Sequence, residues 1–357
     1  MKIIRLSTYL DFGGLESRLA NISHVQDENE WIFICLNRDG NAAEIIRGNK
    51  KQTINLEVKP SIYSYKTFLA VYNIIKKLKP DVVHTSGAEA NFHGILAARL
   101  AGVKRVISEE IGVPKRRFIS KVIFGLIYQF THAMVGNSTV VTEYLQREEY
   151  VPKTKLYVIP NPVIFSEMEE QPSLFDSKKI NILTLSRLEP VKNLPSVLRV
   201  VKRLLEDGHN IQYHVVGSGS SEEELKDLTK QLDIEHAVTF WGYQSTPQAF
   251  FSQADIYILS SFTEGFSNSL VEAMYQKTIS VSTESGAASE IIDHSKNGFI
   301  VPVDDDEILY KTVTEIIELP DNPSEQIRVN AKKTVLENYS LQNHIDLLMQ
   351  LYLSKSI

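Results

Sequence analysis

The sequence contains a single cysteine, Cys35, so neither an intramolecular disulfide nor a cysteine-based zinc site can form. Cys35 lies in the apolar run WIFICL, where we expect a small buried side chain. Long hydrophobic runs are also lacking, since none approaches the roughly 20 apolar residues that span a bilayer. The apolar stretch at the N-terminus is broken by Arg5 and Asp11, which predicts no signal peptide and a cytoplasmic protein.

Basic residues are not in excess. The chain has 38 lysines and arginines against 44 aspartates and glutamates, for a net charge of −6, so a nucleic-acid partner is not expected. Its 43% hydrophobic and 23% charged residues are typical of a folded globular protein. A length of 357 residues suggests two domains.

Short β-rich runs alternate with longer amphipathic runs, which predicts an α/β fold with parallel sheets covered on both faces. The alternation pauses at residues 163–179, which contain Pro172 and many acidic residues and are expected to form a linker. We therefore expect an N-terminal Rossmann-like domain at 1–162 and a C-terminal one at 180–340. A last helix, 341–357, is expected to cross back onto the first domain. Ligands of such sheets bind beyond the carboxyl ends of the strands, so the chemistry is expected in loops that follow strands, facing a cleft.

The loop after the first predicted strand contains Gly13, Gly14 and Glu16. Adjacent glycines allow close backbone approach to a ligand, and the helix that follows offers N–H groups to an anion. The alternative is a plain tight turn. The loop is neither G-x-G-x-x-G nor a P-loop, so neither a dinucleotide site nor an NTPase is predicted.

Two loops of the second half carry charges at strand ends. Arg187 and Lys192 flank a proline at a helix start, where two cations can converge on one diphosphate; the alternative is two solvated cations. Glu264 and Glu272 lie across a glycine turn and a helix start, and carboxylates accept paired hydrogen bonds from vicinal sugar hydroxyls. Ser269-x-x-Glu272 also reads as a capping box, which explains Glu272 without a ligand but leaves Glu264 unexplained.

Other positions carry weaker signals. Gly217 and Gly242 follow strands and are candidates to border a nucleotide, although ordinary turns explain them equally well. His84 ends the run DVVH beside the expected cleft, with a structural histidine as the alternative. The acidic run 304–307 is expected to cap and start a helix.

Together these loops resemble family 4 of the retaining glycosyltransferases, which have the two-domain fold called GT-B. EGFSNSLVEA at 264–273 looks like the family's Glu-x7-Glu motif, and SRLEPVKN at 186–193 looks like its diphosphate clamp. GGLE at 13–16, DVVH at 81–84 and IPNPV at 159–163 match weaker landmarks. The resemblance covers nearly the whole chain in order.

The resemblance implies roles for these residues. Arg187 and Lys192 would neutralise the leaving nucleoside diphosphate, Glu264 would hold the donor sugar, and Glu272 would accept hydrogen bonds from the ribose. The remaining donor contacts would come from the three glycine turns and the helix start, at Gly13, Gly14, Gly217, Gly242, Phe266, Ser267, Asn268 and Ser269. His84 and Glu16 are candidates for the acceptor side. Fixed cations can stabilise the diphosphate without a metal ion, so neither metal nor cofactor is expected.

Glu109 and Glu110 stand where many relatives place an active-site histidine, and Ser86 stands where relatives often have a second one. We list Glu109 as a catalytic candidate whose role is in doubt. Lys115, Arg116 and Arg117 precede an apolar helix, which predicts weak peripheral contact with an anionic membrane; the alternative is a core helix with a solvated basic start.

The sequence therefore predicts a cytoplasmic, metal-independent hexosyltransferase, acting at the inner face of a membrane in polysaccharide biosynthesis. Its donor would be a nucleotide-sugar, with UDP as the default nucleotide, and its acceptor a glycan or lipid-linked saccharide. Two alternatives stay open: a GT-B nucleotide-sugar epimerase, and a non-catalytic donor-binding partner of another transferase.

Overall fold

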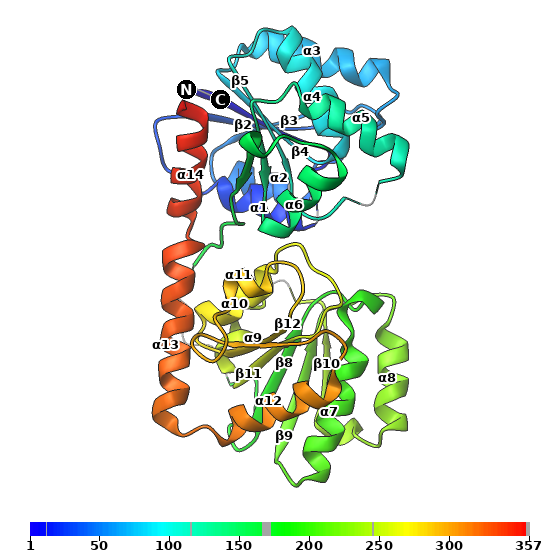
Figure 1. Ribbon diagram of the computed structural model, residues 1–357, viewed down its shortest axis with the longest axis vertical. Coiled ribbons are helices and arrows are strands. Elements are labelled where there is room, and N and C mark those ends of the chain that lie inside the picture. Colours follow the sequence, from blue (N-terminus) through cyan, green and yellow to red (C-terminus); the bar gives the residue numbers. More distant parts are fainter. Residues whose placement is uncertain (12, 115, 166–172, 245, 355–357) are drawn as a thin grey trace. The chain divides into compact units, whose positions relative to one another are not determined.

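The computed structural model describes residues 1–11, 13–114, 116–165, 173–244 and 246–354 of the chain (Figure 1). The chain divides into two compact units, one of residues 1–164 with 340–357 and one of residues 165–339. The division falls inside the segment expected to be a linker. Residues 166–172 of that segment lie outside the described residues, and Phe175 beyond them is buried in the C-terminal unit, where its ring stacks on His214 at 3.7 Å.

The N-terminal unit is built on a seven-stranded sheet with the order β3-β2-β1-β4-β5-β6-β7 and only parallel pairings. Its strands are β1 (Lys2–Ser7), β2 (Glu30–Cys35), β3 (Gln52–Asn55), β4 (Val82–Ser86), β5 (Arg105–Glu110), β6 (Ala133–Gly136) and β7 (Leu156–Val158). Its helices are α1 (Gly14–Ile22), α2 (Asn41–Gly48), α3 (Tyr65–Leu78), α4 (Ala88–Leu100), α5 (Phe118–Tyr128), α6 (Thr139–Glu148) and α14 (Leu341–Leu353).

Successive side chains of these strands point to opposite faces of the sheet, and each face has its own apolar core. Ile4 and Leu6 of β1 pack with Val71 of α3 and Ile95 of α4. Ile3 of the same strand packs on the other face, in a cluster formed with α1, α2 and α14. The terminal helix α14 is thus part of the N-terminal unit, where Leu348 is fully buried.

The C-terminal unit has a six-stranded parallel sheet with the order β10-β9-β8-β11-β12-β13. Its strands are β8 (Ile180–Leu185), β9 (Ile211–Val216), β10 (Val238–Gly242), β11 (Ile256–Leu259), β12 (Ile279–Thr283) and β13 (Phe299–Val301). Its helices are α7 (Leu194–Glu206), α8 (Glu222–Gln231), α9 (Gln248–Gln253), α10 (Asn268–Tyr275), α11 (Ala288–Ile291), α12 (Asp306–Glu318) and α13 (Asp321–Asn338).

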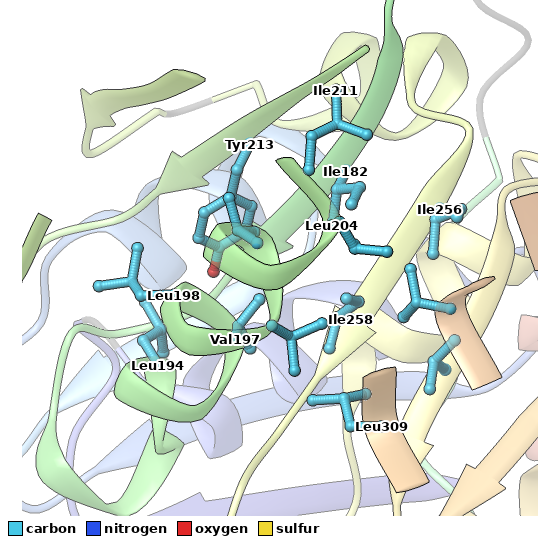
Figure 2. Close-up of a cluster of buried hydrophobic side chains, with 14 of the residues drawn as sticks. Ile182, Leu194, Val197, Leu198, Leu204, Ile211, Tyr213, Ile256, Ile258 and Leu309 are labelled. Carbon is cyan, nitrogen blue, oxygen red and sulfur yellow. The ribbon is translucent and has the colours of Figure 1, made fainter. Parts of the chain in front are cut away.

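One face of this sheet packs against α7 and α12. Figure 2 shows the strand residues Ile182, Tyr213 and Ile256 together with Val197 of α7 and Leu309 of α12. The Tyr213 hydroxyl donates a hydrogen bond of 2.9 Å to Thr184 Oγ1, so the one polar atom of that side chain is satisfied inside the core. The acidic run caps α12 as expected, because Asp305 accepts a hydrogen bond from the Ile308 N–H.

Both sheets reverse their winding at one point, between β1 and β4 in the first and between β8 and β11 in the second. Loops that follow the strands on either side of such a reversal form the usual ligand site of a doubly wound sheet. In the C-terminal unit these are the loops that carry Arg187, Lys192 and Glu264. No helix in the described part of the chain is both long and apolar enough to cross a membrane.

Candidate active site

The loop after β8 carries Arg187 and Lys192 and is held by the neighbouring loops. It ends in a short 3₁₀ turn, Pro190–Lys192, and Asn193 then takes a left-handed conformation with φ 50° before α7 begins. Ser260 Oγ donates a hydrogen bond of 2.8 Å to the Lys192 carbonyl, and the Phe262 N–H donates one of 2.9 Å to the Val191 carbonyl. The loops after β8 and β11 are therefore bonded to each other through their backbones.

Lys192 and Glu264 meet directly across these two loops. The Lys192 ammonium donates to Glu264 Oε1, and the same oxygen accepts a hydrogen bond of 2.7 Å from Ser261 Oγ. Both charged side chains are largely buried, at 14% and 13% exposure, so the pair is screened less than a surface ion pair. The structure thus brings these two predicted site residues together, whereas the contribution of Ser261 was not predicted.

Arg187 differs from Lys192 in its surroundings. Its side chain is exposed, and no residue in the described part of the chain forms a hydrogen bond or ion pair with its guanidinium. Its backbone is fixed all the same, because the next residue, Leu188, is buried and donates a hydrogen bond of 2.9 Å to the Ser218 carbonyl. A guanidinium on an anchored backbone is available to an incoming anion.

Gly217 brings the loop after β9 against the loop after β8. Its φ is +133°, and a Cβ at this position would lie 1.8 Å from the Ser186 carbonyl oxygen, so only glycine fits. The Gly217 N–H donates a hydrogen bond of 2.9 Å to the Gly242 carbonyl. Gly217 therefore lies against the cation loop, and Gly242 lies beside Gly217 at the same edge of the sheet.

Helix α10 begins beside Glu264, and its N-cap is Ser267, whose hydroxyl accepts a hydrogen bond from the Leu270 N–H. The capping-box interpretation of Glu272 is therefore wrong, because it required Ser269 to be the cap. Ser269 Oγ is instead 2.7 Å from the hydroxyl of Tyr257, a fully buried residue of β11. The sequence did not indicate Tyr257, which lies in the apolar run IYIL.

Glu272 has a half-buried side chain for which no hydrogen-bond partner is found among the described residues. Burial raises the pKa of its carboxyl to about 7. Burial raises the pKa of the Tyr257 hydroxyl, and the hydrogen bond with Ser269 lowers it. The negative charges of Glu264 and Glu272 raise this pKa further. The two carboxylates therefore lie near one tyrosine hydroxyl.

Phe266, in the turn between these carboxylates, contacts the ring of Tyr339 at 5.5 Å between centroids. The C-terminal unit thus gathers two cations, two carboxylates and a helix N-terminus at the carboxyl edge of one sheet. Cations and free N–H groups suit a diphosphate, and carboxylates suit sugar hydroxyls.

In the N-terminal unit, Gly13 is the N-cap of α1 and Gly14 its first residue. The carboxylate of Glu16 folds back over Gly13, since a Cβ there would lie 2.2 Å from Glu16 Oε2. Burial raises the pKa of Glu16, its own backbone N–H lowers it, and Asp11 raises it. An anion that approaches this helix start would therefore meet a carboxylate as well as N–H groups.

Glu109 and His84 are both fully buried, so in this conformation neither can contact a substrate. Glu109 forms ion pairs with Arg5 at 2.6 Å and Arg18 at 3.2 Å. Burial raises the pKa of its carboxyl, but the two guanidinium groups lower it by more, so the carboxylate stays charged. The structure corrects the prediction of a catalytic Glu109 and matches the structural alternative for His84, whose pKa burial lowers to about 4.

Arg116 also differs from its prediction as a membrane-facing cation. Its guanidinium forms ion pairs with Glu110 at 2.5 Å and Glu149 at 2.7 Å, and its side chain is only 8% exposed. It lies 3.7 Å from the centroid of the Phe124 ring. Lys115 lies outside the described residues, so Arg117 is the one member of the predicted cluster that the structure places at the surface.

Comparisons with known proteins identify the family. The model described as glycosyl transferases group 1 matches residues 165–334, and the model of glycosyltransferase family 4 matches residues 12–166. The chain is 28% identical to an uncharacterised glycosyltransferase of Methanocaldococcus jannaschii, over 93% of this chain and 92% of that protein. It is 26% identical, over 93% of each chain, to an α-1,4-N-acetyl-D-galactosaminyltransferase of Campylobacter jejuni.

Solved structures share the fold at low identity. HepE of Anabaena, in complex with UDP, has a TM-score of 0.85 and 17% identity, over 98% of this chain and 99% of that one. A glycosyltransferase of Rickettsia africae has a TM-score of 0.87 and 20% identity, over 98% and 97%. The two sheets, the strand-end motifs and these matches agree: the chain belongs to the group 1 glycosyltransferases and has the GT-B fold.

Proposed function

We propose that the protein is a retaining hexosyltransferase that takes its sugar from a UDP-sugar and transfers it to a glycan or lipid-linked saccharide in polysaccharide biosynthesis. The observation that carries this proposal is the site in the C-terminal unit. There Arg187, which has no partner among the described residues, lies on the same loop as Lys192, and Lys192 is bonded to Glu264. In the donor complex, Arg187 and Lys192 bind the diphosphate and Glu264 holds the sugar.

The proposed roles of these residues follow from where charge develops on the donor during sugar transfer. As the glycosidic bond breaks, the sugar becomes oxocarbenium-like and negative charge accumulates on the leaving diphosphate. Two fixed cations and the N-terminus of α10 stabilise that charge without a rearrangement at the moment of reaction. We therefore also propose that transfer needs no divalent cation, so that EDTA leaves the rate unchanged.

The relatives support the nucleotide and the acceptor class. Structures of HepE were solved with UDP, with UDP and glucose, and with UDP-glucose. Relatives from Escherichia coli and Campylobacter jejuni are named as transferases acting on diphosphoundecaprenol-linked sugars. On this basis we assign a UDP-sugar donor and a lipid-linked saccharide acceptor, used at the cytoplasmic face of a membrane.

Weak membrane contact through α5 is part of this proposal. The helix exposes a large apolar side chain at every fourth position, namely at Phe118, Val122 and Leu126. Phe130, just beyond the end of the helix, is also exposed. Phe118 and Leu126 are 75% and 63% exposed, and Arg117 precedes them. An apolar helix face with a basic start is typical of a helix that lies in a membrane interface.

A two-step experiment tests the function. Thermal-shift measurements with UDP-, GDP- and ADP-sugars identify the donor, because a ligand at a hundredfold excess over its Kd adds about 2.7 kcal/mol of stability. The donor is then incubated with and without a lipid-linked oligosaccharide, and the products are separated and their anomeric configuration read by NMR. Extension of the acceptor with retention supports the proposal. An isomerised nucleotide-sugar formed without acceptor indicates an epimerase, and binding without turnover indicates a non-catalytic partner.

A further inference from the structure

Three charged side chains lie together inside the N-terminal unit with no exposed surface. Arg5 comes from β1, Arg18 from α1 and Glu109 from β5. Arg5 Nη2 is 2.6 Å from Glu109 Oε1, and Arg18 Nη2 is 3.2 Å from Glu109 Oε2. One carboxylate therefore holds two guanidinium groups, and a buried charge without such a partner is strongly unfavourable.

Through Arg18, Glu109 is connected to α1. Arg18 is four residues after Gly14, the first residue of α1. Its guanidinium also donates a hydrogen bond of 2.9 Å to Asn161 Oδ1 and one of 3.3 Å to the Ile159 carbonyl. These contacts connect α1, directly after its first turn, to the end of β5 and to the segment that leaves the unit. The Gly13–Gly14 turn, the predicted phosphate contact, is the start of that helix.

Through Arg5, the same carboxylate is connected to the terminal helix. Arg5 Nη1 is 2.9 Å from His84 Nδ1 and 3.3 Å from the Tyr352 hydroxyl, which is itself 2.7 Å from His84 Nδ1. Tyr352 lies in the last turn of α14, and its ring also packs on Trp31. Helices α1 and α14 are thus joined through one buried set of side chains.

We propose that Glu109 is a positioning residue for sugar transfer, acting through Arg18 on the Gly13–Gly14 turn and through Arg5 and Tyr352 on α14. The link to transfer rests on the proposed function, whereas the link between the two helices does not. Glu109 acts on the reaction only by holding α1 in place. The terminal helix α14 is connected to the same carboxylate through Arg5 and Tyr352.

The neighbouring Glu110 provides an internal comparison. Adjacent residues of a strand point to opposite faces, and Glu110 accordingly bonds Arg116 and the Tyr128 hydroxyl on the α5 side of the sheet. Its side chain is nearly as buried, at 11% exposure, but its hydrogen bonds and ion pairs among the described residues go to Asn91, Arg116 and Tyr128, not to α1 or α14. Glu109→Gln and Glu110→Gln therefore make the same chemical change at adjacent positions. Only Glu109→Gln alters the ion pairs with Arg5 and Arg18.

The experiment combines hydrogen–deuterium exchange with kinetics on the full chain. The variants are Glu109→Gln, Arg18→Met, their double variant, Tyr352→Phe and Glu110→Gln, each checked for folding by circular dichroism. Exchange is followed in residues 14–22, 118–128 and 341–353 of the donor-free protein, and kcat/KM is measured with the donor and acceptor found above. Tyr352→Phe removes one hydroxyl and keeps the ring, so it tests the proposal even if Glu109→Gln fails to fold.

The proposal predicts faster exchange in α1 and α14 for Glu109→Gln, Arg18→Met and Tyr352→Phe, and in α5 but not α1 for Glu110→Gln. Displacing the turn lowers kcat/KM by up to about 100-fold in Glu109→Gln. In the double variant, kcat/KM is no more than about threefold lower than in the less active single variant, because both changes break the same connection.

Two results would overturn the proposal. One is normal exchange in α1 together with a large loss of kcat in Glu109→Gln. The other is a kcat/KM loss in the double variant that equals the product of the losses in the two single variants. If the wild type transfers no sugar but the exchange pattern holds, the proposed function fails and the structural connection stands.

Discussion

Lys192 and Glu264 form a largely buried ion pair although 72 residues separate them in the chain. The pair exists because β8 and β11, whose loops carry the two residues, are neighbours at the point where the sheet reverses its winding. Ser261 donates a second hydrogen bond to the same carboxylate oxygen. The ammonium that binds a diphosphate in our proposal is therefore already oriented by the carboxylate that holds the sugar.

Neutralising either cation should weaken donor use. Lys192→Met and Arg187→Met each remove one positive charge from the diphosphate site, and we expect kcat/KM to fall by about 10²- to 10³-fold in each. Lys226→Gln, which removes a surface lysine of α8 that pairs with Glu222, is the matched control. Steady-state kinetics at a fixed acceptor concentration measures the effect. A loss of kcat/KM no larger than that of the control would show that the substituted cation does not bind the donor.

Glu272 should make donor binding depend on pH. Burial raises the pKa of its carboxyl to about 7, so near neutral pH a part of the protein carries this group in its neutral form. A carboxylate accepts hydrogen bonds from ribose hydroxyls better than the acid does, so nucleotide-sugar affinity should rise between about pH 6 and 8, with proton release on binding. Titration calorimetry in two buffers of different ionisation enthalpy measures the proton. Glu272→Gln should abolish both effects, and an unchanged pH profile in this variant would contradict the assignment.

The same group should affect folding with a definite sign. Because the pKa of Glu272 is raised above the usual 4.5 of a glutamate, the native protein binds this proton more tightly than the unfolded chain does. The free energy of unfolding should therefore fall as pH rises from about 4.5 to 7, by no more than about 3 kcal/mol. Urea unfolding across this range should show a shallower pH dependence for Glu272→Gln than for the wild type.

Gly217→Ala should disrupt the donor loops by steric conflict. The added Cβ would lie 1.8 Å from the Ser186 carbonyl oxygen at a φ of +133°, so we expect a loss of about 2–4 kcal/mol in unfolding free energy. Gly208→Ala is the control, because its φ is +86° but nothing lies within 4 Å of the new Cβ. Chemical denaturation of both variants separates the steric conflict from the backbone penalty, and equal losses would show that the close approach is unimportant.

Membrane contact through α5 should depend on its exposed apolar side chains. Phe118→Ser with Leu126→Ser should abolish co-sedimentation with anionic vesicles at low salt, because burial of these groups is lost. Leu100→Ser is the control, since Leu100 is 68% exposed on a different helix. Arg117→Ala should weaken binding only at low salt, and vesicle binding that is equal in the double variant and the wild type would refute contact through α5.

Much of this fold is predictable because its strands are apolar runs in a regular alternation with helices. The polar strand β3, with the sequence QTIN, and the short helix α2 were not predicted, since neither has a long apolar pattern. Lys192 and Glu264 were predicted because they occur in motifs at strand ends. The burial of Glu109 was not, because it depends on Arg5 and Arg18, which are 104 and 91 residues away and whose side chains lie inside the fold rather than at its surface.

The most direct test of the account is the turnover of Glu264→Gln. This variant keeps the shape of the side chain and removes the charge that faces Lys192, while Glu223→Gln, on the surface of α8, serves as the control. We predict that kcat falls by more than about 100-fold, because this carboxylate holds the sugar and also orients the Lys192 ammonium. Turnover equal to that of Glu223→Gln would contradict the account.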